Sequence, residues 1–256
     1  MRGRRALIAR RALALGLVAA LGGCAALSRP AQRWADMRHG PSGQAPEPAT
    51  TREAVIQVYA ARAIGWRGAF AVHPWIVLKP SGADAYRRYE VMGWGVDAGR
   101  PAIRVDRAGP DDHWFGARPE LLVDARGAGV DALVAKVEAA IAAYPYPATY
   151  RTWPGPNSNT FIAWIGRSVP ELRLHLPPTA VGKDYLPNGV PVGLTPSHRG
   201  VQLSLLGLAG VLAGVDEGVE VNVLGLTFGV DVLAPALKLP VAGRIGVTPS
   251  PAREAR

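Results

Sequence analysis

The chain has 256 residues, of which 48% are hydrophobic and 19% charged, and this composition excludes a disordered chain and allows one domain with a sizeable core. The formal charge of +9 overstates its basic character, because five arginines lie within residues 1–23, and without them 24 basic residues stand against 20 acidic ones, a surplus of +4. This small surplus is spread along the chain with no run of Lys and Arg, so we expect no nucleic acid partner.

The N-terminus is typical of an export signal followed by a site of lipid attachment. After a basic stretch come ten apolar residues, 12–21, which are too few for a membrane-spanning helix of about 20 residues. Leu21-Gly22-Gly23-Cys24 resembles the lipobox of bacterial lipoproteins, which implies removal of residues 1–23 and acylation of Cys24, the only cysteine. We therefore expect a lipid-anchored membrane protein of the cell envelope that faces the periplasm, with the outer membrane favoured by Ala25. An ordinary signal peptide and an uncleaved anchor are the alternatives.

The next residues predict a tether and a single domain. Residues 24–50 are rich in Ala, Pro, Ser and Gly, as flexible linkers are, and we place one domain at residues 51–246 and a disordered tail at 247–256. Within the domain, four runs rich in β-branched and aromatic residues predict strands, at residues 54–64, 69–79, 87–94 and 102–107.

Two helices are predicted after these strands. Apolar side chains recur at three- and four-residue spacing over residues 130–144, so we expect an amphipathic helix there with Leu133, Val137 and Ile141 buried. A second helix is expected after Asn157, which is a residue type that favours the N-cap position.

The last third of the chain alternates apolar and polar residues, which is typical of strands with two different faces. Residues 201–205 and 219–223 predict two antiparallel strands that turn near Glu217, with Gln202 and Ser204 on one face and Val201, Leu203 and Leu205 on the other. Residues 201–215 are apolar enough to raise membrane contact as an alternative, but they are too short for a spanning helix, and we interpret them as a buried hairpin. The expected fold class is α+β: a small antiparallel sheet packed on two or three helices, with an additional C-terminal β-hairpin region.

Two candidate sites stand out by their polar residues. Asn157, Ser158, Asn159 and Thr160 follow a Trp-Pro-Gly-Pro turn, and the simplest interpretation of this cluster is a helix cap. His73 lies at the start of a predicted strand. Asp111-Asp112-His113 is interpreted as a turn, because adjacent residues rarely point at one ion, and we expect no metal and no cofactor.

Three longer stretches resemble an uncharacterised bacterial family, domain of unknown function 3750, over residues 54–245; they are residues 73–80, 153–161 and 176–185. A strand with His73-Pro74-Trp75, a second strand and a helix that opens at Asn157 are also distantly similar to permuted papain-like proteins. That group includes lecithin–retinol acyltransferase-like enzymes and NlpC-type wall peptidases. The likeness implies His73 as the base, Ser158 in place of the nucleophilic cysteine, Glu90 as the residue that orients the base, and a cleft lined by Asn157, Asn159, Thr160 and Trp75.

A serine in that place needs more help than a cysteine, because its hydroxyl must lose a proton to a base and its intermediate needs an oxyanion hole. The sequence leaves three functions open. One is a Ser/His hydrolase or acyltransferase acting on an envelope amide or ester, with cell wall or lipid as substrate. Another is a non-catalytic envelope lipoprotein that binds cell-wall, lipid or protein partners, and the third is a structural lipoprotein whose contact surface is residues 201–231. The substrate, the partner and the oligomeric state stay open.

Overall fold

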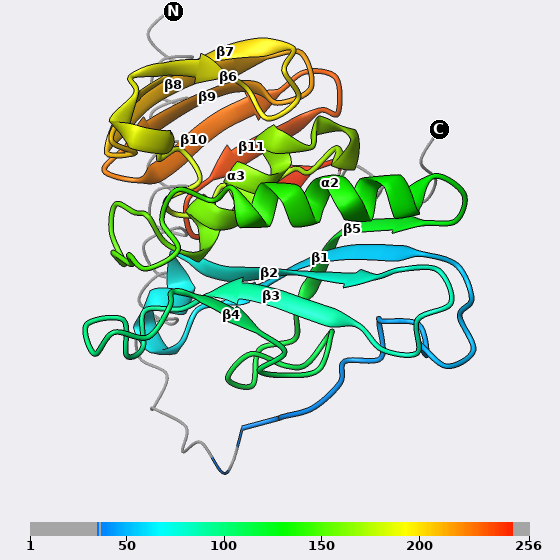
Figure 1. Ribbon diagram of the computed structural model, residues 1–256. Helices are drawn as coiled ribbons and strands as arrows, with labels where there is room; N and C mark the ends of the chain where they lie inside the picture. The colour runs from blue at the N-terminus through cyan, green and yellow to red at the C-terminus, as the bar shows by residue number, and fades with distance from the viewer. Residues whose placement is uncertain (1–34, 36, 248–256) are drawn as a thin grey trace, which may run out of the picture.

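The computed structural model describes residues 35 and 37–247, and the predicted export signal, Cys24 and residues 248–256 of the predicted tail lie outside them. Figure 1 shows two sheets as separate layers, with both described α-helices on the side of the first sheet that faces the second. The first sheet has the order β4-β3-β2-β1-β5, and its strands are β1 (Val55–Arg62), β2 (Val72–Lys79), β3 (Arg87–Val91), β4 (Ile103–Val105) and β5 (Glu120–Arg126). The helices are α2 (Val130–Ala142) and α3 (Ser158–Ser168), with 3-10 turns at η2 (Gly65–Ala69), η3 (Pro170–Leu172) and η4 (Pro187–Gly189).

Both faces of the first sheet are covered, which is why every residue of β2 is buried. On one face Ile76 and Leu78 pack with Phe161 of α3 and with the apolar stripe of α2. On the other face Trp75 packs with Trp114, which comes from a loop. Because successive residues of a strand point to opposite faces, even-numbered and odd-numbered positions of β2 belong to different layers.

The structure confirms the helices and strands predicted for this half of the chain. α2 buries Leu133, Val137 and Ile141, and residues 54–107 contain antiparallel strands on the side of the core that faces it. α3 begins directly after Asn157. Within the described residues, no helix has the length and apolar character required to cross a membrane.

The C-terminal third forms a seven-stranded antiparallel sheet, so the prediction of a single hairpin was wrong. Each strand pairs with its neighbours in sequence, and the strands are β6 (Val192–Leu194), β7 (Gly200–Leu205), β8 (Ala209–Gly214), β9 (Gly218–Val223), β10 (Leu226–Asp231), β11 (Ala236–Leu239) and β12 (Gly243–Gly246). The two predicted strands are β7 and β9, but β8 lies between them, and the turn near Glu217 joins β8 to β9. The α+β class is therefore confirmed, whereas the described chain is richer in strands than a small sheet packed on helices.

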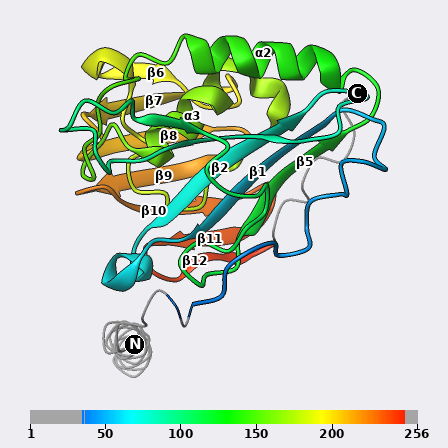
Figure 2. The same ribbon diagram turned by 60° about the horizontal axis from the view of Figure 1, so that its bottom comes forward.

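The two sheets approach each other where β1 ends. Nη2 of Arg62, the last residue of β1, donates a hydrogen bond to the carbonyl oxygen of Val241 (3.1 Å), which lies in the turn between β11 and β12. Figure 2 shows this end of the second sheet beside β1 and β5. This contact is one direct link between the two sheets at this edge.

A short sequence repeat marks two equivalent turns of the second sheet. Ser204-Leu-Leu-Gly207 ends β7, and Asn222-Val-Leu-Gly225 ends β9. The Ser204 hydroxyl accepts a hydrogen bond from the backbone N–H of Gly207 (3.0 Å), and the Asn222 side chain accepts one from Gly225 (2.8 Å). Both glycines have positive φ angles, of 70° and 81°. Residues with a side chain adopt such angles only at an energetic cost.

The last part of the predicted tether lies against the domain. Pro41 forms an isolated β-bridge with Asp112. The carboxylate of Asp111 accepts hydrogen bonds from the Ser42 hydroxyl (2.9 Å) and from the backbone N–H of Gln44 (2.6 Å). The two aspartates thus hold this segment in place.

Candidate functional site

The start of α3 is fixed by a complete helix cap. Oδ1 of Asn157 accepts hydrogen bonds from the backbone N–H groups of Asn159 (2.9 Å) and Thr160 (3.1 Å). The Thr160 hydroxyl in turn accepts one from the backbone N–H of Asn157 (3.1 Å). All four residues from Asn157 to Thr160, Ser158 included, are buried. The N–H groups of Asn159 and Thr160, which an oxyanion hole at this helix start would use, are therefore already bound.

The Asn159 side chain ties the start of α3 to the rest of the domain. Its Nδ2 donates to the carbonyl oxygen of Val72 at the start of β2 (3.1 Å) and to that of Val181 (2.9 Å). The side chain that the papain-like likeness assigns to a cleft thus lies buried between a strand, a helix and a loop.

The structure brings His73 and Glu90 together in a buried group on the first sheet. Nε2 of His73 lies 2.8 Å from Oε2 of Glu90, which also accepts a hydrogen bond from Arg88 (3.1 Å), and the imidazole stacks on Trp114 with ring centroids 3.8 Å apart. Burial lowers the pKa of His73, although Glu90 acts in the opposite direction. Burial also acts to raise the pKa of Glu90, but His73 and Arg88 outweigh it and hold this pKa below its ordinary value. The arrangement favours a neutral imidazole beside a carboxylate.

The structure does not bring His73 and Ser158 together. His73 lies on the same face of β2 as Trp75, whereas α3 packs against Ile76 and Leu78 on the opposite face. Within the described residues no hydrogen bond joins His73 to Ser158, and Trp75 donates its Nε1–H to the carbonyl oxygen of Pro110 (2.8 Å). The expectation of one cleft lined by both residues therefore finds no support in these contacts. β2 is buried on both faces, so its sequence does not reveal which face meets the helix.

The second sheet carries a feature that the sequence interpretation missed: one of its faces is apolar throughout and turned to solvent. The pairing of the strands arranges this outer face, as we call it, in three rows that run across the sheet. The first row is Leu194, Val201, Ala213, Val219, Val230, Leu237 and Ile245; the second is Val192, Leu203, Val211, Val221 and Phe228; and the third is Leu205, Ala209, Val223 and Leu226. No position in the three rows holds a polar or charged side chain.

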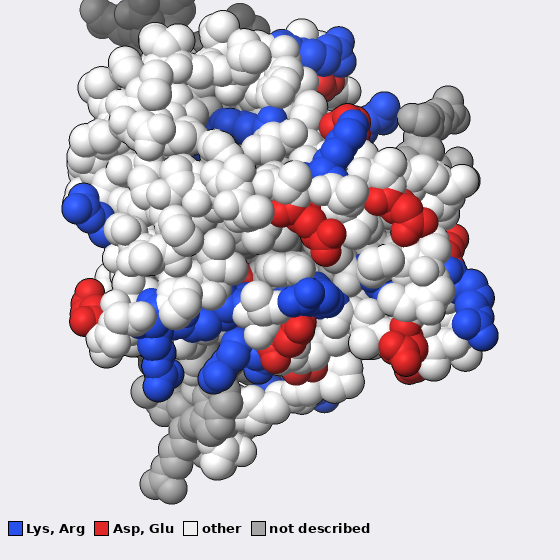
Figure 3. Space-filling view, in the orientation of Figure 1, with Lys and Arg blue, Asp and Glu red and all other residues white. Residues whose placement is uncertain are grey.

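Many of these side chains are widely exposed, so the prediction that residues 201–215 form a buried hairpin was wrong. The exposed fraction is 65% for Leu205, 59% for Val201 and 44% for Phe228. Figure 3 shows that the upper left part of the molecule is free of charged groups, whereas Lys, Arg, Asp and Glu lie toward its upper right and lower down. Soluble proteins rarely expose an apolar patch larger than about 300–600 Å². The outer face is therefore a candidate contact surface.

The inner face of the same sheet is polar and points toward the rest of the protein. Gln202, Glu220 and Asn222 are buried there. The carboxylate of Asp184, which follows α3, accepts hydrogen bonds from the side-chain amides of Gln202 (2.7 Å) and Asn222 (2.9 Å). The predicted separation of Gln202 and Ser204 from the apolar side is confirmed. The polar face of this sheet nevertheless points toward the protein and its apolar face toward solvent. A half-solvated sheet normally has the opposite arrangement, with its apolar face on the core.

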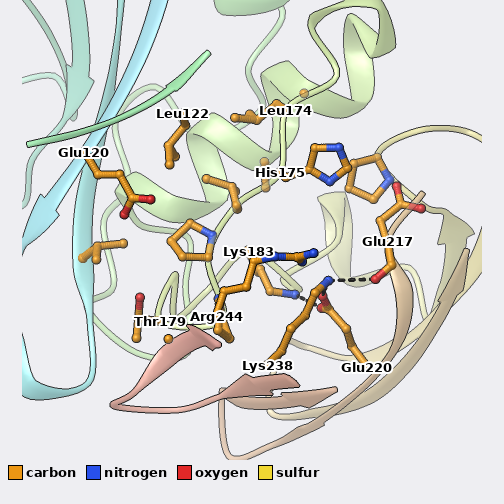
Figure 4. A pocket seen from close by; sticks show the side chains of 18 of the residues that line it. Glu120, Leu122, Leu174, His175, Thr179, Lys183, Glu217, Glu220, Lys238 and Arg244 are labelled. Atoms are coloured by element: carbon orange, nitrogen blue, oxygen red, sulfur yellow. Dashed lines mark hydrogen bonds and ion pairs between the residues drawn. The ribbon is translucent and has the colours of Figure 1, made fainter. Parts of the chain in front are cut away.

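Buried ion pairs connect side chains of the inner face with one another and with the loop after α3, as Figure 4 shows. Glu220 lies between two ammonium groups, with Oε2 2.6 Å from Nζ of Lys183 and Oε1 2.5 Å from Nζ of Lys238. Lys183 also lies 3.0 Å from Oδ1 of Asp184. Burial acts to raise the pKa of Glu220, but the two lysines outweigh it and lower this pKa. Among residues 35 and 37–247, no group of three His, Cys, Asp or Glu side chains is arranged to hold a metal ion.

Comparison with known proteins gives a family match. The sequence model of a family described as protein of unknown function (DUF3750) matches residues 53–185. This region covers just over half of the chain and contains the first sheet, α2, α3, Lys183 and Asp184, but it ends before the seven-stranded sheet. No curated protein and no solved structure matches the chain, so the likeness to papain-like proteins stays a prediction.

Proposed function

We propose, for a chain that belongs to the DUF3750 family of proteins of unknown function, a non-catalytic role as a cell-envelope lipoprotein that binds a lipid bilayer through its outer face. The lipid expected on Cys24 attaches the chain to the membrane. The outer face then brings the folded domain into contact with that membrane, with the acyl chains as its partner.

The observation that supports this proposal is the uninterrupted apolar character of the three rows. Transfer of one exposed Val or Leu side chain from water into hydrocarbon contributes about 1–2 kcal/mol. The first row crosses all seven strands, the second five and the third four, so their contributions add over a broad surface. If the apolar residues of this sheet formed a core, they would lie on its inner face. The inner face instead carries the buried residues Glu220 and Lys238.

The apolar surface also continues around the ends of the sheet, which favours a bilayer over a second copy of the chain. Leu206 and Leu224 are exposed in turns at one end, and Val232 and Leu233 at the other. Two copies stacked face to face would leave these turn residues at the rim, which is normally polar in a protein interface. A lipid surface can surround the turns as well as the rows.

The length of chain before the domain supports the same partner. The chain runs 17 residues from Cys24 to Pro41, where it is held against the domain, and a segment of that length spans at most about 60 Å when extended. An acylated Cys24 would therefore keep the domain close to the membrane that the outer face would contact. The Ser/His hydrolase is less well supported, because Ser158 and His73 belong to different layers and the N–H groups at the start of α3 are bound by Asn157.

A vesicle flotation experiment tests the proposal without the lipid anchor. Residues 25–256, which include every described residue, are mixed with phosphatidylcholine vesicles. The protein should float with the vesicles, and about 1 M salt should not release it, because the attraction is apolar and not ionic. Val221→Glu places a charge in the middle row and should abolish flotation. Val105→Glu, a similarly exposed valine on β4, is the matched control and should float normally.

Two results would overturn the proposal. The first is flotation of Val221→Glu at the level of the parent chain. The second is the absence of vesicle binding together with a dimer in lipid-free solution that Val221→Glu dissociates. That second result would make the outer face an interface between two copies of the chain.

A further inference from the structure

A cavity of about 290 Å³ lies between the two sheets, beside the ion pairs of the inner face (Figure 4). Its walls come from the start of β2, from β5, from α3 and the loop after it, and from the inner face of the second sheet. Pockets that bind small molecules commonly have volumes of about 300–1,000 Å³. The cavity thus has room for a small ligand.

One wall of the cavity is apolar. Val72 and Leu122 line it from the first sheet, and Leu174 and Leu176 line it from the loop after α3. Figure 4 shows Leu122 and Leu174 across the cavity from the side that holds Lys238 and Glu220. A ligand in this space would meet hydrocarbon on one side and charge on the other.

The opposite wall has more cations than anions. Glu220 neutralises the two lysines together with Asp184, and Asp231 pairs with Arg244 (2.8 Å). The excess of positive charge rests on the remaining arginines. The full charged lining consists of Arg62, Arg167, Arg173, Lys183, Lys238 and Arg244 against Glu120, Asp184, Glu217 and Glu220.

Arg167 of α3 has hydrogen bonds but no carboxylate partner in the described chain. It donates to the side-chain oxygen of Gln202 (2.6 Å) and to the carbonyl oxygens of Lys183 (3.2 Å) and Ala163 (3.4 Å), all of which are neutral acceptors. Its buried Nε has no hydrogen-bond partner within the described chain, where its guanidinium also makes no salt bridge. Burial lowers the pKa of Arg167, although nearby carboxylates act to raise it. A half-buried cation with an unpaired, buried N–H group is costly, and a bound anion would supply charge-assisted hydrogen bonds.

We propose that this cavity binds a small organic anion, with a carboxylate or phosphate group toward Arg167 and an apolar part against Leu122 and Leu174. The site lies on the inner side of the second sheet, so it is separate from the outer face and does not depend on the bilayer contact. Its charged and apolar walls together would select a ligand that carries both kinds of group.

Calorimetric titration of residues 25–256 with hexyl phosphate tests this proposal. Hexyl phosphate should bind at least about 10-fold more tightly than inorganic phosphate or hexanol, because each of these lacks one of the two groups. Arg167→Gln should weaken the binding of hexyl phosphate by about 10-fold or more. Arg167→Lys keeps the charge but loses the planar fork, and should weaken it less. Arg107→Gln, at an exposed arginine that does not line the cavity, is the matched control and should have no effect.

A second set of variants separates failure of this proposal from failure of the bilayer proposal and from misfolding. Val221→Glu should stop vesicle flotation and leave the affinity for hexyl phosphate unchanged, so either proposal can fail alone. If Arg167→Gln does not fold, as judged by circular dichroism, the exposed Arg173 of the same lining replaces it, and Arg173→Gln should weaken binding several-fold. The proposal is overturned if hexyl phosphate does not bind, if hexanol or inorganic phosphate binds equally well, or if the arginine variant that folds binds like the parent.

Discussion

Nζ of Lys183 lies 2.6 Å from Oε2 of Glu220, and this contact joins the loop after α3 to the central region of the second sheet. Both side chains are more than nine-tenths buried. The bond therefore connects the part of the chain that matches the family to the part beyond it, in a place that water does not screen.

Removal of the Glu220 charge should destabilise the whole domain. Glu220→Gln leaves Lys183 and Lys238 buried beside a neutral group, and loss of one partner of a buried pair costs about 3–5 kcal/mol. Urea denaturation followed by circular dichroism measures the loss. Glu171→Gln is the control, because its pair with Lys136 is about half exposed and should contribute about 1 kcal/mol or less. Equal losses in both variants would contradict the importance of the buried network.

The stability of the protein should fall between about pH 7 and pH 5 through His73. Burial lowers the folded-state pKa of His73 below the ordinary value of about 6.5, so the unfolded chain binds the proton more readily. The protonation of His73 therefore leaves stability unaffected at pH values above the unfolded-state pKa of about 6.5. Stability decreases as the pH falls below that value toward the folded-state pKa. His73→Gln removes the titration and should flatten the dependence of unfolding free energy on pH. His175, whose pKa burial also lowers, adds its own slope, and His175→Gln separates the two. The same slope in His73→Gln as in the parent would refute the prediction.

Asn157 should matter more for stability than Ser158. Oδ1 of Asn157 accepts two backbone N–H groups, and its Nδ2 donates to two carbonyl oxygens, so Asn157→Ala should cost about 2 kcal/mol. Ser158→Ala removes no part of this cap and should cost clearly less. Thermal and urea denaturation of the two variants measure the difference. Labelling of Ser158 by a fluorophosphonate probe, lost in Ser158→Ala, would reinstate the hydrolase prediction.

Cys24 should be the first residue of the mature protein and should carry lipid. Cys24→Ala should block acylation, because the thiol is the group that the lipid modifies, and should leave an uncleaved precursor or a form without lipid. Mass spectrometry of the N-terminus of the native protein decides the matter. A mature chain that begins elsewhere, with an unmodified Cys24, would end the lipoprotein interpretation.

The helices of the first half could be predicted because their signals are local. The spacing of Leu133, Val137 and Ile141 defines one face of a helix by itself, and an asparagine before an apolar run is a cap wherever the rest of the chain lies. The strands around His73 were predicted by their composition for the same reason. Neither signal reveals which face of β2 meets the helix, and so the pairing of His73 with Ser158 could not be judged from sequence.

The second sheet was predicted only in part, because alternation reveals two faces but not which face is turned to solvent. Val201, Leu203 and Leu205 were assigned to a core on the rule that apolar residues face inward, and they face outward. β8 is as long as β7 and β9, but it contains two glycines and two alanines, so it gave little strand signal of its own. The ion pairs of Glu220 escaped prediction because their partners are distant in sequence.

The hydrogen bonds of Asp184 can form only after the strands of the second sheet that carry its partners have been synthesised. The amide groups that bind this carboxylate come 18 and 38 residues later in the chain, so they emerge from the ribosome after it. Until they arrive, Lys183 and Asp184 lack the partners that the second sheet supplies. The region that the family match covers therefore completes its native contacts only after residues beyond the match have been synthesised.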